Sequence, residues 1–183
     1  MARTNHIRMG VRTAVAVFLL APSAWAQFAT TGTATVNLTL AAEADITITT
    51  ATTNLTSSGT EFSNYTGTTS FTYKIRTTTV GGSGSITFKI TTDFAPSGGP
   101  SVASPPTAGD TLRYTCSVSS PATQCAGSVT ATTTTETSVA TFSQDAHSAA
   151  AGNSGSVGWT LTNDPRYKTG TFTAVGTFTI TAL

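Results

Sequence analysis

The sequence is poor in charged residues, histidine, cysteine and tryptophan. Asp, Glu, Lys and Arg make up only 9% of the 183 residues, and the formal net charge is +1, whereas soluble domains average roughly 25% charged residues. Without a basic excess the chain has little with which to neutralise a phosphate backbone, which argues against nucleic acid as a partner. The 38% of hydrophobic residues is too high for a disordered, charged tail.

Groups that carry enzyme chemistry are also scarce. His147 is the only histidine after residue 26, and no G-x-S-x-G motif places a nucleophilic serine. Zinc needs three or four clustered ligands, which the sequence does not show. Asp110, Asn163 and Asp164 carry oxygens suited to calcium, but they are equally ordinary turn residues. We expect no enzyme activity, metal or cofactor; the alternative is a hydrolase whose carboxylate pair the sequence does not reveal.

A long apolar run is missing, and the longest one stands at the start of the chain. Arg3, Arg8 and Arg12 flank a short apolar stretch at residues 13–22, followed by the small-x-small site of residues 24–26. This pattern predicts a secretory signal peptide, residues 1–26, cleaved after Ala26. The run is shorter than the roughly 20 residues of a membrane-spanning helix. We therefore expect a secreted or cell-surface protein with no transmembrane segment in the mature chain and a net charge of −2.

Cysteine occurs only twice, at Cys116 and Cys125. An exported chain meets oxidising conditions, and an even number of cysteines at short spacing predicts a disulfide. Ser119, Ser120 and Pro121 lie between them and favour a turn. We therefore expect the disulfide to pin a hairpin or a compact loop. The spacing fits neither a redox C-x-x-C motif nor a zinc site.

Threonine and serine are abundant, with 43 and 19 residues, and apolar residues alternate with them at a period of two. Such alternation predicts strands with one buried and one wet face. No segment shows a helical repeat, so about eight or nine strands predict one all-β, antiparallel sandwich over residues 42–183. Residues 27–41 are an N-terminal extension or a first strand. Residues 81–84 are rich in glycine and predict a hairpin that pairs residues 71–76 with residues 86–91.

The two ends of the predicted mature chain carry the most specific pattern. Gly170 stands fourteenth from the end of the sequence, and apolar residues alternate from there onward. This segment resembles the C-terminal β-zipper strand of chaperone–usher pilus subunits and their spore-coat-U-like secreted relatives, although Ala182 stands where that family has an aromatic residue. Residues 28–40, with Gly32, resemble the N-terminal donor extension of the same family. The early cysteine of the family has no counterpart before Cys116.

The resemblance implies an immunoglobulin-like sandwich that is incomplete in one subunit and is completed by a strand from a neighbour. It also implies self-association or assembly with other surface subunits, and a periplasmic chaperone as a further partner. The implied donor residues are Gly32, Ala34, Val36, Leu38 and Leu40. The implied acceptor groove lies along Gly170, Phe172, Ala174, Gly176, Phe178 and Ile180. The alternative is that both ends are ordinary strands of a closed sandwich.

A second resemblance gives a different function. Residues 159–161 (Trp-Thr-Leu) are similar to the W-x-L motif of secreted cell-wall-binding domains, which carry two such motifs. That likeness implies a monomeric surface module that binds glycan or cell wall through the loop of residues 95–110 and through Trp159. The sequence favours Trp159 as a core residue of a buried strand. It likewise favours a structural or adhesive subunit that assembles by strand donation over the binding module.

Overall fold

The computed structural model describes residues 31–57, 59 and 61–183. The predicted signal peptide and Phe28 lie outside the described residues. The chain divides after Leu38, and Thr39–Leu183 forms one compact unit. That unit contains all the strands.

Ten strands account for the regular structure of the described residues, none of which is helical. Seven strands have six or more residues, and β2, β6 and β7 have only two each. The strands are β1 (Glu43–Ile48), β2 (Thr56–Ser57), β3 (Tyr65–Arg76), β4 (Gly84–Ala95), β5 (Arg113–Val118), β6 (Thr123–Gln124), β7 (Val129–Thr130), β8 (Thr137–Phe142), β9 (Asn153–Leu161) and β10 (Thr173–Ala182). The all-β prediction is confirmed.

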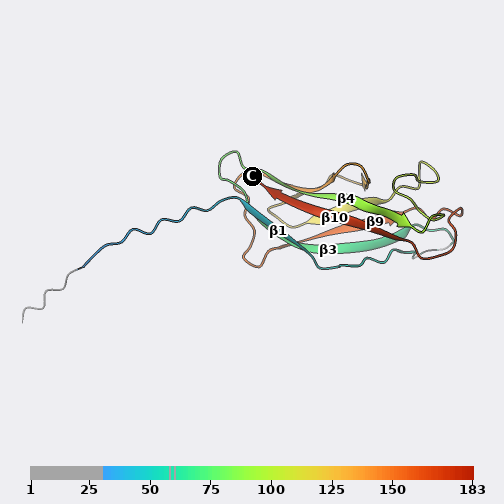
Figure 1. The fold of residues 1–183 in the computed structure, drawn as a ribbon, viewed down its shortest axis with the longest axis horizontal. Coiled ribbons are helices and arrows are strands. Elements are labelled where there is room, and N and C mark those ends of the chain that lie inside the picture. The colour runs from blue at the N-terminus through green and yellow to red at the C-terminus, as the bar shows by residue number, and fades with distance from the viewer. Residues whose placement is uncertain (1–30, 58, 60) are drawn as a thin grey trace, which may run out of the picture. The chain divides into compact units, whose positions relative to one another are not determined.

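The strands form two antiparallel sheets that pack face to face (Figure 1). The first sheet has the order β1-β3-β9-β5-β7, with β2 beside β3, and the second has the order β10-β4-β8-β6. In an immunoglobulin domain one sheet is A-B-E-D and the other contains C, F and G. By their positions in the sheets, β1, β3, β9 and β5 take the places of A, B, E and D, and β4 and β10 those of C and F, whereas β8, which lies beside β4, is an additional strand between β5 and β9 in the chain. The predicted antiparallel sandwich is therefore confirmed.

The predicted hairpin between residues 71–76 and 86–91 is wrong. β3 pairs with β1 and β9 in the first sheet, whereas β4 pairs with β10 and β8 in the second. The connection of residues 77–83 carries the chain from one sheet to the other. Both strands do alternate as expected, but alternation determines which face is buried and not which strand is the neighbour.

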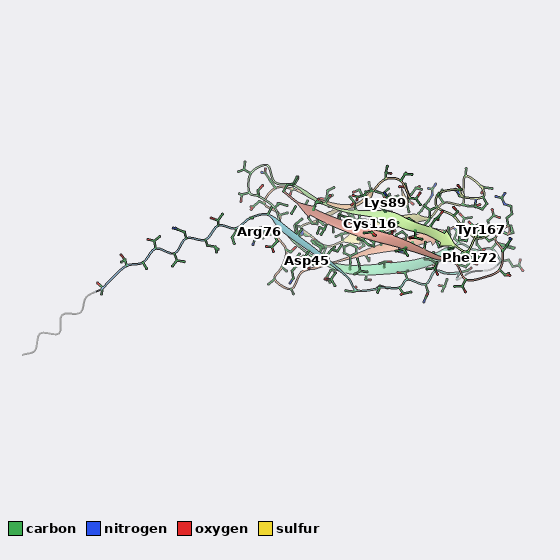
Figure 2. All side chains as sticks on the ribbon, viewed as in Figure 1. Asp45, Arg76, Lys89, Cys116, Tyr167 and Phe172 are labelled. Carbon is green, nitrogen blue, oxygen red and sulfur yellow. A yellow bond between two sulfur atoms is a disulfide. The ribbon has the colours of Figure 1, made fainter. Side chains whose placement is uncertain are left out.

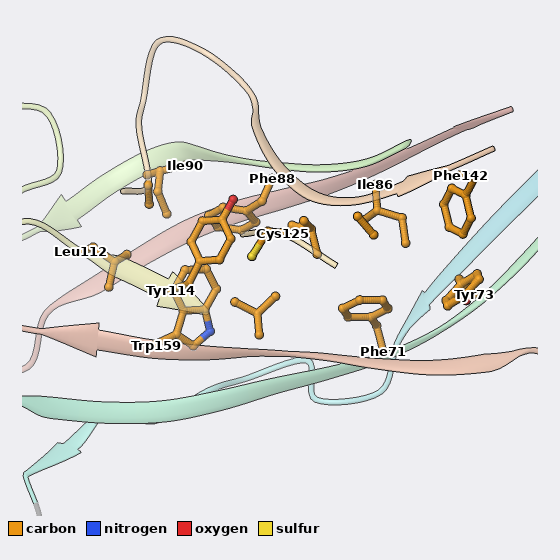
Figure 3. Close-up of a cluster of buried hydrophobic side chains, with 14 of the residues drawn as sticks. Phe71, Tyr73, Ile86, Phe88, Ile90, Leu112, Tyr114, Cys125, Phe142 and Trp159 are labelled. Atoms are coloured by element: carbon orange, nitrogen blue, oxygen red, sulfur yellow. The ribbon is translucent and has the colours of Figure 1, made fainter. Parts of the chain in front are cut away.

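The core lies between the inner faces of the two sheets (Figure 3). Phe88 is at its centre, with ring centroids 4.9 Å from Trp159, 4.8 Å from Phe178 and 5.9 Å from Tyr114. The Trp159 side chain is buried, and its Nε1 donates a hydrogen bond of 2.8 Å to Thr69 Oγ1. Trp159 is therefore a core residue with its polar group satisfied inside the protein.

The disulfide between Cys116 and Cys125 is confirmed, with Cα atoms 5.6 Å apart. It does not pin a hairpin, because Cys116 belongs to β5 in the first sheet and Cys125 follows β6 in the second. Cys125 N also donates to Val139 O in β8. The short β6 pairs with β8 rather than with β5, so the bridge joins the two sheets across the core.

The loop after β4, predicted at residues 95–110, is organised by Asp93. Its Oδ1 accepts hydrogen bonds from Phe94 N (2.8 Å) and Val102 N (2.7 Å), and its Oδ2 from Ser101 Oγ (2.6 Å) and Ala103 N (3.1 Å). Partial burial alone would raise the pKa of Asp93, but these four hydrogen bonds outweigh it and hold the pKa below its usual value. The charged form of Asp93 thus stabilises the loop.

We expect Asp93→Asn to lower the free energy of unfolding by about 2 kcal/mol at neutral pH, because the amide accepts fewer hydrogen bonds than the carboxylate and leaves partly buried N–H groups without an acceptor. A lowered folded-state pKa adds stability above the unfolded pKa, and this is lost as the pH falls through the folded pKa. The difference between wild type and variant should therefore shrink below about pH 4. Urea unfolding at neutral and acidic pH measures both effects. The exposed Asp45→Asn is the control, and a difference that does not change with pH would contradict this role.

Candidate functional site

β10 is an edge strand that carries neither charge nor proline. It pairs with β4 from Thr173 opposite Ala95 to Ala182 opposite Gly84, and no strand in the part of the chain that the structure describes pairs with its other edge. Natural sheets usually guard such edges with charged residues, prolines or a covering segment. Residues 171–183 contain no charged residue and no proline. The edge of β10 therefore offers unpaired backbone groups without a charge to repel another strand.

β1 forms the edge of the first sheet on the same side of the sandwich. It pairs with β3 from Glu43 opposite Arg76 to Ile48 opposite Phe71, and it contacts β10 across the sandwich (Figure 1). Unlike β10, β1 carries charge, since Glu43 and Asp45 are exposed on its outer face. Glu43 Oε2 accepts a hydrogen bond of 3.0 Å from Arg76 Nη2. The free edges of both sheets thus meet on one side.

The core is only partly covered on this side. On the inner strands β3, β4 and β9, the core-facing side chains such as Phe71, Ile86 and Val157 are buried. The core-facing apolar side chains of the two edge strands are only half-buried, although they pack on the same core: Ala44, Ile46 and Ile48 on β1, and Phe178, Ile180 and Ala182 on β10. One additional strand along this side would remove their remaining apolar surface from water, which is favourable at roughly 25 cal/mol per Å².

Gly176 is an exposed position on the core-facing side of β10. It points toward the core, because a Cβ placed on it would overlap the ring of Phe88, and yet Gly176 is exposed. At this level the core is covered by backbone alone. Any substitution at Gly176 must displace Phe88, which itself packs against Tyr114 and Trp159.

The predicted acceptor residues divide into two groups. Gly176, Phe178 and Ile180 lie on the core-facing side of β10, where the Phe178 ring centroid is 5.7 Å from that of Phe71, whereas Ala174 is half-buried near the start of the strand. Gly170 and Phe172 precede the strand instead. Phe172 packs against Gly99 in the loop after β4, and Figure 2 shows it at the end of the sandwich opposite Arg76. Sequence reasoning missed Ile46 and Ile48, since alternation does not reveal that β1 is an edge strand.

The predicted donor residues lie outside every strand. The structure assigns no secondary structure to residues 31–42. Val36, Leu38 and Leu40 are 91%, 79% and 63% exposed, and nothing lies within 4 Å of the place where a Cβ on Gly32 would be. Ala34 is exposed as well. The first strand of the compact unit is β1, which begins at Glu43.

The sparse catalytic candidates do not form a reactive cluster. His147 is exposed, and its Nδ1 lies 2.9 Å from the backbone oxygen of Asp145, not from a carboxylate. Across residues 31–57, 59 and 61–183 no three His, Cys, Asp or Glu side chains gather as ligands for one metal ion.

Asp110 and Asp164 come together at the end of the sandwich where Phe172 lies. Both are close to the guanidinium of Arg166, a residue that the sequence did not single out. Arg166 Nη2 lies 3.1 Å from Asp164 Oδ2 and 3.7 Å from Asp110 Oδ2, and both carboxylates are buried. Hydrogen bonds from the backbone and side chain of Arg166 lower the pKa of Asp164. Burial, together with the two carboxylates, raises the pKa of Tyr167 to about 12. The cluster ties the loop before β5 to the loop after β9.

Comparisons with family models, with curated proteins and with solved structures found no match. None of the described residues belongs to a helix able to cross a membrane. The features of the described residues that bear on function are therefore the sandwich and the neighbouring free edges of β1 and β10.

Proposed function

We propose that the protein is an extracellular structural subunit that assembles by strand donation, in which residues 31–40 of one copy pair with the free edge of β10 in another. One observation carries this proposal. The same chain has an uncharged sheet edge, β10, whose core-facing side chains are only half-buried, and an exposed segment, residues 31–40, in which apolar residues alternate. Backbone hydrogen bonds along the edge provide affinity, and alternate side chains entering the core set the register.

The segment fits the edge in length and in chemistry. Residues 32–40 would span about 30 Å as a strand, similar to the ten residues of β10. Ala34, Val36, Leu38 and Leu40 would then face the core, and the polar residues between them would face water. Residues 27–42 contain no charged residue, so no charge would have to be buried.

The occupant is a second copy because the segment cannot easily fold back on its own domain. Only Ala41 and Ala42 separate Leu40 from β1. Two-residue reversals between antiparallel strands require positive φ angles, which glycine and asparagine adopt and alanine resists. Segment and groove are different parts of the surface, so each copy can give one strand and receive one. Such a contact is head-to-tail and builds open-ended assemblies.

The cross-sheet disulfide supports an extracellular setting, since disulfides persist in oxidising compartments. It agrees with the signal peptide predicted for residues 1–26. Nothing favours the glycan-binding alternative: Trp159 is buried, and residues 95–110 contain no aromatic side chain that would form a sugar-stacking platform.

Removal of the segment tests the proposal. We expect residues 27–183 to form multimers in size exclusion and extended assemblies in electron microscopy. The shortened chain of residues 41–183 should stay monomeric and should bind a peptide of residues 31–42, which supplies the missing strand. A shortened chain that still assembles, or a folded one that ignores the peptide, would contradict strand donation.

A further inference from the structure

Three apolar side chains stand exposed at the end of the sandwich where β1 begins. Leu40, Val80 and Leu183 are 63%, 87% and 70% exposed. Leu183 is fixed there, because its N donates to Ser83 O (2.8 Å) and its O accepts from Thr78 N (3.1 Å) and Ser83 N (3.2 Å). Figure 1 marks the C-terminus at this end. Neither Val80 nor Leu183 belongs to the donor segment or to the core-facing side of β10.

A hollow of about 300 Å³ connects Leu40 to the loop that carries Val80. Leu40 and Ala42 line one part of it, and Thr77, Thr78 and Thr79 line another. Its walls are mostly methyl groups, hydroxyls and backbone, with Arg76, Asp145 and His147 as the titratable residues and Arg76 already paired with Glu43. Such a surface suits contact with a folded protein better than binding of a charged small molecule.

The donor segment is tethered closely to this end. Ala41 and Ala42 are the only residues between Leu40 and β1, so the Cα atoms of Leu40 and Glu43 are at most about 11 Å apart. Arg76 shortens the reach further, since its Nε donates a hydrogen bond of 2.8 Å to Ala41 O while its Nη2 binds Glu43. A copy that holds Leu40 in its groove must therefore lie directly against this end of the donor.

We propose that Val80 and Leu183 form a second contact surface next to Leu40, covered in the assembly by the same copy that receives residues 31–40. This inference rests on the proposed function and adds a partner surface outside the exchanged strand. Burial of Val80 and Leu183 removes apolar side chains from water and fixes the angle between successive domains. The surface thereby sets the strength of assembly without touching the groove.

Val80→Asp separates this surface from the groove when two quantities are measured on the chain of residues 27–183. The first is the affinity of the dilute monomer for a labelled peptide of residues 31–42. Because this peptide lacks the folded domain, it cannot contact Val80 and Leu183. The second is the concentration at which the chain assembles, by sedimentation. Thr160→Asp is the control, since it places the same charge on the outer face of the first sheet, where Thr160 is exposed.

We expect Val80→Asp to leave peptide affinity within about twofold and to raise the assembly concentration at least about tenfold, whereas Thr160→Asp changes neither. Unchanged assembly by Val80→Asp would overturn the second surface and leave strand donation intact. Loss of peptide affinity in Val80→Asp would also overturn it, because Val80 would then belong to the groove. Failure of the wild-type chain to bind the peptide would refute strand donation itself.

Discussion

Replacing both Val36 and Leu38 by aspartate should abolish assembly of residues 27–183 at concentrations where the wild type is fully assembled. In the proposed complex both side chains enter the core beside Phe178 and Ile180. Each apolar side chain contributes roughly 1.5–3 kcal/mol when buried, and an unpaired carboxylate in the core adds a larger penalty. The combined loss corresponds to more than about a hundredfold in affinity. Analytical ultracentrifugation across a concentration series measures it.

The same segment provides its own matched control. Thr35 and Asn37 alternate with Val36 and Leu38, so they would face water in the inserted strand. Thr35→Asp combined with Asn37→Asp adds equal charge to the same segment, and we expect assembly within about tenfold of the wild type. If both double variants lost assembly equally, charge alone would be what prevents assembly. If both assembled like the wild type, the segment would not be inserted in the neighbouring copy.

Phe88→Ala should lower the free energy of unfolding by about 4 kcal/mol, the cost of removing a fully buried aromatic ring from a packed core. Phe88 is 3% exposed and contacts rings from β5, β9 and β10, so it joins both sheets. The surroundings can collapse little, because the glycine above it, Gly176, has no side chain to fill the cavity.

Urea denaturation followed by tryptophan fluorescence measures this loss, since Trp159 lies beside Phe88. Lys89→Ala, one position along on the outer face of β4, is the control and should change stability by less than about 0.5 kcal/mol. A loss below about 1 kcal/mol for Phe88→Ala would mean that the two sheets are not held together through this ring.

Alternation in the sequence was enough to predict the seven longer strands but not their partners, and it is also present in residues 32–40, which form no strand. Phe71, Tyr73 and Ile75 are buried as their spacing predicts, and so are Ile86, Phe88 and Ile90. The threonine excess also lies where a wet sheet face predicts it, as in the row of Thr181, Ser85, Thr141 and Thr123 across the second sheet. The hairpin failed because sheet membership depends on packing between segments far apart in the chain, which periodicity does not encode.

The candidate site was predicted only in part, for a related reason. The core-facing residues of β10 followed from the alternation of the last strand. Ile46 and Ile48 did not, because their significance depends on β1 being the edge beside β10. Likewise, no local signal showed that Arg166 would pair with Asp110, more than fifty residues away in sequence. The chaperone–usher resemblance implied a role for both ends, whereas only the structure shows that the edge residues of β1 are half-buried.

Amide hydrogen exchange tests the central claim most directly. The shortened chain of residues 41–183 is compared with and without a saturating peptide of residues 31–42, and exchange is followed at each sheet edge. If the peptide pairs with the free edge of β10, amides in Thr173–Ala182 should slow by at least about tenfold, while those of the opposite edges, β6 and β7, stay unchanged. Unchanged exchange in β10, or equal protection at every edge, would contradict the account.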